Sequence, residues 1–408
     1  MTGPYFDELE TRPAEAREAA LMAALPAQVA HARAHAPYYA ASLAGIDPAA
    51  VTTRAALAAL PVTRKSDLIA QQRRVPPFGG LNATPPSALA RLFASPGPIY
   101  DPEGHGRDWW RFARALHAAG FRRGEILHNC FSYHLTPAGA MLESAAHAIG
   151  CAVIPGGVGQ TEQQVRAIAD LRPHGYSGTP SFLKIILEKA AELGADVSSM
   201  GKALVSGEAL PPPLRQDLAD RGVAVLQCYG TADLGLIAYE SPAREGMIVD
   251  EGVIVEIVRP GTGDPVPDGE PGEVVVTGFN RDYPLIRFAT GDVSAILAGA
   301  SPCGRTNARI KGWMGRADQT TKVRGMFVHP AQVAEVVRRH PEVARARLVV
   351  SGEDGRDRMT LECETASSDP GLAARIGETL QSVTKLRGEV ALERRIADDG
   401  KVISDRRG

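Results

Sequence analysis

Short apolar segments alternate with amphipathic segments between residues 108 and 230, and this alternation limits the possible folds more than any other feature. Strands are predicted for residues 124–130, 151–155, 203–206 and 223–227. Helices are predicted for residues 109–119 and 136–149, and for segments that begin at residues 161 and 180. Strands separated by helices pair in parallel, because each crossover carries the chain back across the sheet. We therefore predict an α/β fold with layered parallel strands.

Helix starts can be recognised at two places, and a third helical segment precedes this region. Residues 161–164, Thr-Glu-Gln-Gln, have the spacing of a capping box, in which two side chains bond the exposed backbone amides. Thr179 is followed by Pro180, which suits an N-cap and the first helical position. Residues 14–45 also carry apolar positions at helical spacing. The helix after Thr179 would offer N-terminal amides to an anion.

The pattern changes after about residue 245. Residues 247–258 and 273–277 alternate with period two, which predicts strands of a small, β-barrel-like lobe. From residue 316 onward a compact α+β unit is predicted, with helices at 330–339 and 371–384 and strands at 345–350, 357–363 and 388–394. We therefore predict a large N-terminal domain of several subdomains, residues 1–315, and a small mobile C-terminal domain, residues 316–408.

Charge and cysteine content bear on partners and compartment. The chain has 45 Lys plus Arg and 47 Asp plus Glu, and a net charge of −2 predicts no nucleic-acid partner. The five cysteines are odd in number and far apart, which favours free thiols in a reducing compartment. The acidic N-terminus does not resemble a secretory signal, and no segment forms a clean membrane span. We expect a cytoplasmic protein that does not bind membranes.

Residues 283–293, Tyr-Pro-Leu-Ile-Arg-Phe-Ala-Thr-Gly-Asp-Val, place a fixed cation and a carboxylate within six residues. The Arg287 guanidinium offers five N–H donors and keeps its charge, whereas the Asp292 carboxylate can accept from two adjacent hydroxyls. An arginine for phosphate and an aspartate for ribose would suit a nucleotide. Taken alone, the segment is equally consistent with a β-hairpin that carries one exposed ion pair.

Four further segments contain glycine turns with hydroxyl or charged side chains, namely residues 177–181, 206–210, 229–233 and 315–330. In this order, the five segments resemble those of the adenylate-forming acyl-CoA synthetases, in the phenylacetate–CoA ligase branch. The resemblance extends along nearly the whole chain and includes residues 60–65, 154–164 and 322–328. It implies an AMP-forming acid–thiol ligase. A carboxylic acid and ATP would give an acyl-adenylate, and coenzyme A would then displace AMP.

The resemblance also implies roles for individual residues. It assigns the nucleotide site to Ser206, Gly207, Glu208, Tyr229, Gly230, Thr231, Asp292 and Arg316. Tyr229 would stack on the adenine, and Asp292 would hold the ribose hydroxyls. Two residues would be catalytic: Lys401 would bridge the carboxylate and the α-phosphate, and Arg287 would face the phosphates. Asp318 would be the hinge of the small domain.

Residues for the other two substrates are assigned less specifically. By the same resemblance, Lys322 and Gly325 would flank the channel for coenzyme A. Phe131, Tyr133 and Gly157 could border the acyl pocket, although the bare sequence equally suits core and turn positions. The acid would be aromatic or small.

The chain departs from the family pattern in three places. In the expected phosphate loop, Ser95 and Gly97 persist, but two prolines remove amide donors and Asp101 adds a negative charge. This change would weaken binding of the β- and γ-phosphates. Asp233 replaces the usual glutamate as the magnesium ligand, which still suits a hard cation. Of the zinc ligands found in some relatives only Cys303 remains, so no zinc is expected.

Two alternatives to a CoA ligase remain open from the sequence. The adenylate could pass to an acceptor other than coenzyme A, such as an amine. A degenerate homologue could instead bind nucleotide or coenzyme A without effective turnover, which the altered loop at residues 95–102 favours. Retention of Asp292, Arg316 and Lys401 favours an enzyme. A homodimer is a further expectation from the resemblance.

Overall fold

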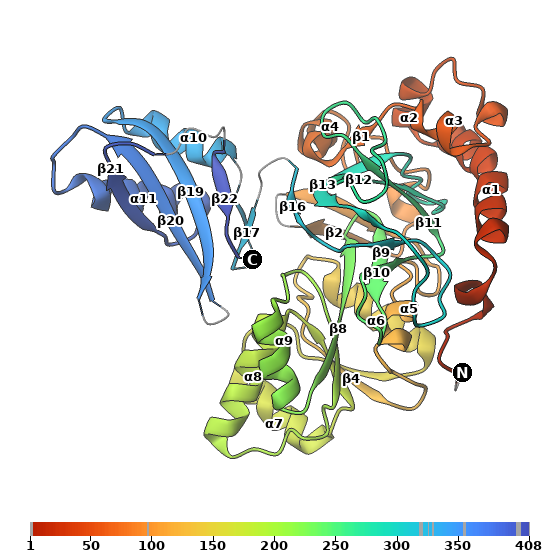
Figure 1. The fold of residues 1–408 in the computed structure, drawn as a ribbon, viewed down its shortest axis with the longest axis horizontal. Helices are drawn as coiled ribbons and strands as arrows, with labels where there is room; N and C mark the ends of the chain where they lie inside the picture. The colour runs from red at the N-terminus through yellow and green to blue at the C-terminus, as the bar shows by residue number, and fades with distance from the viewer. Residues whose placement is uncertain are drawn as a thin grey trace. The chain divides into compact units, whose positions relative to one another are not determined.

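The computed structural model describes residues 3–95, 98–317, 321–324, 326–328, 330–353, 356–396 and 401–407. It divides into two compact units, Met1–Met314 and Gly315–Gly408, against an expected boundary after residue 315 (Figure 1). Gly97, Asp318 and Gly325 lie outside the described residues, as does the Lys322 side chain. No helix in the described part of the chain combines the length and apolar character needed to cross a bilayer.

The predicted α/β fold is confirmed in the first unit. Its largest sheet has the order β14-β15-β10-β9-β8-β7-β6-β4-β5, and the strands from β5 to β8 are parallel. The parallel strands are β4 (Ile126–Asn129), β5 (Ala152–Pro155), β6 (Gly175–Gly178), β7 (Lys202–Val205) and β8 (Ala224–Thr231). The antiparallel extension consists of β9 (Gly235–Glu240), β10 (Met247–Val249), β14 (Ile296–Leu297) and β15 (Arg309–Ile310).

Helices cover both faces of the parallel strands. In Figure 1, α7, α8 and α9 lie on one side, whereas α5 and α6 lie on the other. These helices are α5 (Ala113–Ala118), α6 (Ala138–Ile149), α7 (Thr161–Leu171), α8 (Pro180–Leu193) and α9 (Pro212–Asp220). The predicted cap of α8 is confirmed, since the Thr179 side chain accepts a hydrogen bond from the Phe182 amide at 3.4 Å. The predicted helix at residues 109–119 is shorter in the structure.

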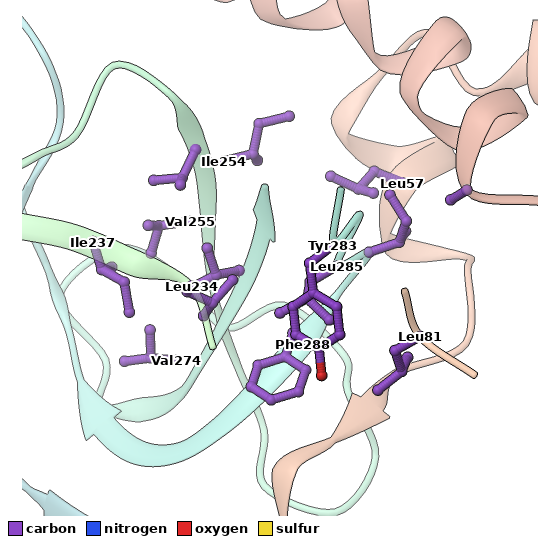
Figure 2. Close-up of a cluster of buried hydrophobic side chains, with 14 of the residues drawn as sticks. Leu57, Leu81, Leu234, Ile237, Ile254, Val255, Val274, Tyr283, Leu285 and Phe288 are labelled. Carbon is purple, nitrogen blue, oxygen red and sulfur yellow. The ribbon is translucent and has the colours of Figure 1, made fainter. Parts of the chain in front are cut away.

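A second sheet has the order β1-β13-β12-β11. Its strands are β1 (Thr63–Arg64), β11 (Val253–Val258), β12 (Gly272–Gly278) and β13 (Phe288–Ser294). The single strand predicted for residues 247–258 is wrong. It is broken at Asp250, whose carboxylate accepts from the Gly252 amide and from Arg111 Nε, and this turn separates β10 from β11. The main apolar core includes Leu234, Val255 and Phe288 (Figure 2).

The N-terminal elements pack around this second sheet and its core. They are η1 (Glu8–Thr11), α1 (Ala14–His35), α2 (Pro37–Ser42), η2 (Pro48–Ala50), α3 (Arg54–Ala58), η3 (Lys65–Asp67), α4 (Leu68–Arg74) and η4 (Pro86–Ala88). The helical segment predicted for residues 14–45 breaks at Ala36, because the residue before a proline disfavours helical backbone angles. A two-stranded hairpin follows, formed by β2 (Arg91–Ser95) and β3 (Ile99–Glu103).

The second unit contains the α+β elements expected from the sequence. They are β16 (Gly315–Arg316), β17 (Thr321–Val323), β18 (Met326–Val328), α10 (Pro330–Arg339), β19 (Val343–Glu353), β20 (Arg356–Thr365), α11 (Leu372–Thr384), β21 (Glu389–Glu393) and β22 (Ile403–Asp405). The sheet order is β21-β20-β19-β22, and apolar residues of α10 and α11 form a core with it. Because β22 pairs in parallel with β19, Lys401 lies just before an edge strand.

Candidate active site

The loops after β6 and β7 meet at the carboxyl edge of the parallel sheet, as expected for neighbouring parallel strands. The Ser181 hydroxyl donates to Glu208 Oε2 at 2.5 Å, and the Ser206 amide donates to the Gly178 carbonyl oxygen at 3.2 Å. Ser206 also donates its hydroxyl hydrogen to the Cys228 carbonyl oxygen of β8 at 2.8 Å. These bonds connect the loops of three strands, so Ser206 and Glu208 lie at the edge where a nucleotide would bind.

Tyr229 and Asp292, predicted for the nucleoside, are in direct contact. The Tyr229 hydroxyl lies 2.9 Å from Asp292 Oδ2 and 3.1 Å from Thr290 Oγ1. The Asp292 amide donates to Thr290 Oγ1 at 3.1 Å across Gly291, whose φ of 77° favours glycine. Trp313 Nε1 donates to the other oxygen, Asp292 Oδ1, at 3.1 Å. Two donors therefore hold the buried carboxylate at the end of β13.

Trp313 contacts the candidate site through Asp292, although no motif in the sequence assigned it to the site. The indole ring is 40% exposed, which is unusual for a tryptophan whose N–H is already bonded to a buried carboxylate. The signal available in the sequence is a tryptophan two positions before the glycine that opens the predicted hinge segment.

Gly230 and Thr231 shape the turn that presents Asp233. A Cβ atom on Gly230 would lie 2.6 Å from the Gly235 carbonyl oxygen, so β8 and β9 can approach each other only at a glycine. Thr231 Oγ1 accepts from the Leu234 amide at 3.2 Å. The turn directs the Asp233 carboxylate inward, where Lys65 Nζ lies 2.5 Å from Asp233 Oδ2. Lys65, which the sequence analysis gave no role, is therefore part of the candidate site.

The expectation that Arg287 faces the phosphates is wrong. Its side chain is 2% exposed, and Nε donates to Glu256 Oε2 at 3.1 Å. The terminal nitrogens donate to three backbone carbonyl oxygens, those of Ala58, Leu60 and Gly263, at 2.6–2.7 Å. A guanidinium that is buried and bonded to these partners ties separate chain segments together and does not face a nucleotide. The alternative expectation of an exposed ion pair within residues 283–293 is wrong as well, because Arg287 pairs with Glu256 of β11 and both side chains are buried.

In the described part of the expected phosphate loop, residues 95 and 98–102, Ser95 ends β2 and residues 99–102 belong to β3. The Ser95 hydroxyl donates to the Ile99 carbonyl oxygen at 3.1 Å, within the hairpin itself. Asp101 does not project toward a polyphosphate but is fully buried. Burial, and then the nearby negative charge of Asp233, hold the pKa of Asp101 well above its usual range. The hairpin therefore brings a second carboxyl group beside Asp233.

Asn129 connects the three residues predicted for the acyl pocket. Its side-chain nitrogen donates to the Tyr133 hydroxyl at 2.7 Å, and its backbone oxygen accepts from the Gly157 amide at 3.0 Å. Its side-chain oxygen accepts from the Phe131 amide at 3.3 Å and from the Ser177 hydroxyl at 2.9 Å. Asn129 is fully buried at the end of β4. It joins the expected acyl-pocket segment to β6.

Gln164 fixes the neighbouring loop. The capping box predicted for residues 161–164 is wrong, because α7 begins without a side-chain cap. The Gln164 side-chain nitrogen instead donates to the carbonyl oxygens of Gly157 and Gly159, at 3.1 and 2.6 Å. Its oxygen lies 2.8 Å from His128 Nε2. The glutamine thus holds the glycine-rich loop against β4, a role that depends on tertiary contacts.

Comparisons with known proteins agree with this arrangement. The profile of AMP-binding enzymes matches residues 130–280. The phenylacetate–coenzyme A ligase of Thermus thermophilus is 34% identical over 380 aligned positions, covering 89% of this chain and 84% of the relative. The chain belongs to the phenylacetate–CoA ligase family. The phenylacetate–coenzyme A ligase of Escherichia coli strain K12 is 30% identical and covers 83% of this chain and 79% of the relative.

A solved structure supports the fold of this phenylacetate–CoA ligase family member. The crystal structure of 2-hydroxyisobutyryl-CoA ligase, in complex with 2-HIB-AMP and CoA, matches with a TM-score of 0.85. The match covers 99% of this chain and 93% of that chain, at 24% identity. As a family member, the protein is an ATP-dependent, AMP-forming acid–CoA ligase that works through an acyl-adenylate. The function expected from the sequence is confirmed.

The remaining expected residues of this family member lie in the second unit. Arg316 lies in β16 and is partly buried. The Lys401 side chain is exposed, and its backbone oxygen accepts from Arg347 Nε at 3.1 Å. That bond anchors the backbone beside β22.

Cys303, the residue compared with a zinc ligand, is half-buried in the first unit. Burial would raise the pKa of its thiol, but hydrogen bonds from Ser241, Ser301 and Arg305 outweigh that effect and lower the pKa to about 7. Among the residues that the structure describes, no three His, Cys, Asp or Glu side chains are grouped so as to hold a metal ion. The expectation of no zinc stays a prediction.

Proposed function

We propose that this ligase activates an aromatic or small carboxylic acid. In the first step, a carboxylate oxygen attacks the α-phosphorus of ATP, the bond to the bridging oxygen breaks, and pyrophosphate leaves with that electron pair. In the second, the thiolate of coenzyme A attacks the acyl carbon, and AMP leaves with its phosphate oxygen. The thiol proton passes to solvent or to the departing phosphate. The observation that carries the proposal is the buried Asp292 carboxylate, held by Tyr229 beside the edge of the sheet.

The nucleoside half of the site follows from these contacts. Asp292 would accept hydrogen bonds from the ribose hydroxyls, which would replace or share the donors that Tyr229 and Trp313 supply now. Ser206 and Glu208 would border the adenine with Gly207, where a φ of 81° allows the backbone a close approach. Hydrogen bonds to a buried carboxylate are among the stronger ones, so this contact would contribute much of the AMP affinity.

Lys401 would supply the positive charge for adenylation. A carboxylate and an α-phosphate repel each other, and charge builds on the phosphate oxygens in the transition state, so a cation placed there lowers the barrier. Arg316 would approach the ribose and phosphate, and Lys322 would flank the channel for coenzyme A. Asp318 would serve as the hinge on which the small domain turns between the two steps.

The acyl pocket would be bordered by Phe131, Tyr133 and Gly157. Two aromatic rings and a glycine, held together through Asn129, suit a flat or short acyl group. The Tyr133 hydroxyl is already bonded to Asn129, so its ring rather than its hydroxyl would contact the acid. The named relatives act on phenylacetate, and the aromatic lining supports the same class of acid here.

The test is carboxylate-dependent release of pyrophosphate, measured with and without coenzyme A over a panel of aryl and short acyl acids. Release followed by thioester formation is expected with at least one acid. Lys401→Ala should reduce adenylation by a factor of about 100 or more, since it removes a charge aimed at the transition state, while sparing thioester formation from supplied acyl-adenylate. Lys385→Asn is the matched control, because Lys385 is an exposed lysine of the same unit and asparagine tolerates its φ of 63°. Equal loss in both steps would contradict the role of Lys401.

Two alternatives are outcomes of the same assay. Release that does not depend on coenzyme A, with acyl transfer to an amine, would favour another acceptor. No release under any condition, with AMP or coenzyme A still bound, would indicate a degenerate homologue, which the self-bonded hairpin of Ser95 favours. A cytoplasmic location and a homodimer are further proposals, and the buried free cysteines support a reducing compartment.

A further inference from the structure

Trp313 donates a hydrogen bond to the carboxylate that is proposed to bind the ribose. Its Nε1 lies 3.1 Å from Asp292 Oδ1, and the Tyr229 hydroxyl lies 2.9 Å from Asp292 Oδ2. The Asp292 side chain is buried, whereas the indole ring is exposed, so the ring lies at the boundary between this carboxylate and solvent. A ribose would bring two adjacent hydroxyl donors to the same two oxygens. The side chains that bond Asp292 now would therefore compete with an incoming nucleotide.

The two donors differ in their freedom to move. Tyr229 is buried in the main apolar core, and its hydroxyl also lies 3.1 Å from Thr290 Oγ1. Trp313 belongs to none of the apolar clusters in the described part of the chain. An exposed side chain changes rotamer readily, whereas moving a buried ring disturbs a close-packed core. Of the two donors, Trp313 is therefore the one that a nucleotide can displace.

The backbone on either side of Trp313 is held in place. The Ser294 hydroxyl donates to the Gly312 carbonyl oxygen at 2.7 Å, and the Met314 amide donates to the Val293 carbonyl oxygen at 2.9 Å. Both bonds tie the segment to the end of β13, the strand that carries Asp292. The indole would therefore leave Asp292 by rotation of its side chain, and the fixed backbone would return it to the same oxygen.

We propose that Trp313 sets the nucleotide affinity of this enzyme by competing with the ribose for Asp292. In the free protein the indole N–H bonds Asp292 Oδ1. When AMP or ATP binds, a ribose hydroxyl takes the place of the indole, whose N–H turns to solvent. The displaced bond lowers the affinity for nucleotide, and its return helps the product AMP to leave. The inference rests on the proposed function, because it requires that Asp292 bind the ribose.

Trp109 offers a matched comparison within the same chain. Its Nε1 donates to Asp282 Oδ2 at 2.9 Å, and the Thr84 hydroxyl donates to Asp282 Oδ1 at 2.6 Å. Trp109 therefore makes the same kind of bond as Trp313, but its ring packs against two apolar clusters and Asp282 is not among the residues assigned to the nucleotide. The third tryptophan of the chain, Trp110, is fully buried. A nucleotide should move only the indole of Trp313.

The first measurement follows the indole N–H groups of the full chain by NMR, with tryptophan labelled by the NMR-active nitrogen isotope. A bond to a carboxylate moves an indole proton downfield, because such charge-assisted bonds are strong. Trp313→Phe identifies the Trp313 signal by its loss. Without nucleotide, Asp292→Asn should move this signal upfield. In the wild type, AMP should also move it upfield and speed its exchange with water, while the Trp109 signal stays in place.

The second measurement is the affinity for AMP by calorimetry. Trp313→Phe keeps an aromatic ring and removes the donor. It should tighten AMP binding about three- to tenfold, which corresponds to an indole that occupies Asp292 in about two thirds to nine tenths of the free molecules. Trp109→Phe is the matched control and should leave the affinity unchanged. The nucleotide 2′,3′-dideoxy-AMP lacks both ribose hydroxyls, so it should bind the wild type and Trp313→Phe equally. A merely structural role of Trp313 would change AMP affinity in the opposite direction, since Asp292 would lose its support.

AMP affinity that is unchanged or weaker in Trp313→Phe would overturn the proposal. So would a wild type saturated with AMP whose Trp313 signal does not move, or a signal that Asp292→Asn leaves in place. In these cases the pyrophosphate assay would still support the proposed function, because it does not depend on Trp313. A wild type that binds no AMP would overturn the competition as well, and failure of the pyrophosphate assay would then show that the proposed function is wrong too.

Discussion

Replacing Arg287 by methionine should destabilise the protein rather than weaken nucleotide binding directly. The guanidinium is buried with Glu256 as its ion partner, and it donates to the backbone oxygens of Ala58, Leu60 and Gly263. Methionine has a similar length and no donors. The substitution therefore leaves one carboxylate without its counter-charge and three carbonyl oxygens without a donor in a site that excludes water.

The magnitude follows from the ion pair and the hydrogen bonds that the substitution removes. Removing one partner of a buried ion pair typically costs about 3–5 kcal/mol, because the other charge stays buried. The three carbonyl oxygens add to this, at about 1 kcal/mol each where no water can reach them. These effects overlap, so we expect the free energy of unfolding to fall by about 4–6 kcal/mol. A domain stable by about 5–15 kcal/mol would lose a large part of its margin.

The assay is urea unfolding of the wild type, Arg287→Met, Glu256→Gln and the double variant. Burial raises the pKa of Glu256 although Arg287 lowers it, and without the arginine that pKa should rise further. A group with a raised pKa in the folded state favours folding when it is protonated. The cost of Arg287→Met should therefore shrink as the pH falls through the raised pKa of Glu256 towards the usual glutamate range. Glu256→Gln in the double variant should recover part of the cost at neutral pH.

Two results would contradict the structural role of Arg287. If Arg287→Met unfolds within about 1 kcal/mol of the wild type, and the KM for ATP rises at least tenfold, the arginine contacts the nucleotide after all. A double variant no more stable than Arg287→Met at neutral pH would also contradict the assigned pairing with Glu256. Circular dichroism before unfolding would confirm that each variant begins folded.

Two further predictions concern single carboxyl groups. Asp292→Asn should weaken AMP binding by a factor of about 10–100, which corresponds to about 1.5–3 kcal/mol for hydrogen bonds to a charged group. The free energy of unfolding should change far less. Unchanged AMP affinity in calorimetry would contradict the ribose role of Asp292. Burial is the main reason that the pKa of Asp108 is raised to about 7. The protonated group therefore stabilises the folded state below about pH 4, by up to about 4 kcal/mol, and this contribution is lost as the pH rises through 7. Asp108→Asn should therefore flatten the fall of stability between about pH 4 and 7, and an unchanged slope would show that Asp108 is ionised throughout.

The features that could be predicted best from the sequence are those that depend on the spacing of nearby residues. The parallel strands and the helix after Thr179 depend on apolar spacing and on one cap, and the structure has them near the expected bounds. The pairing of Tyr229 with Asp292 agrees with their shared assignment to the nucleoside. Both residues lie within strands, near their carboxyl ends, so the sheets themselves place their side chains.

The errors concern residues whose partners the local sequence pattern does not indicate. The partner of Arg287 is Glu256, 31 residues away on another strand, and nothing near Arg287 in the sequence distinguishes burial from exposure. Gln164 had the spacing of a capping box, but its side chain is drawn to the glycine loop that precedes it. In both cases the local pattern predicted one set of contacts, but the side chain makes more hydrogen bonds in its tertiary contacts, and these determine its position.

Asp101 shows how a sequence departure can change meaning once its surroundings are known. In the sequence it adds a negative charge to a loop that should bind phosphate, which counts against turnover. In the structure the carboxyl group is buried, and burial together with the nearby negative charge of Asp233 raises its pKa, which favours the neutral form. A neutral Asp101 carboxyl group would not repel the polyphosphate. The aspartate in the divergent hairpin is therefore no direct argument against catalysis.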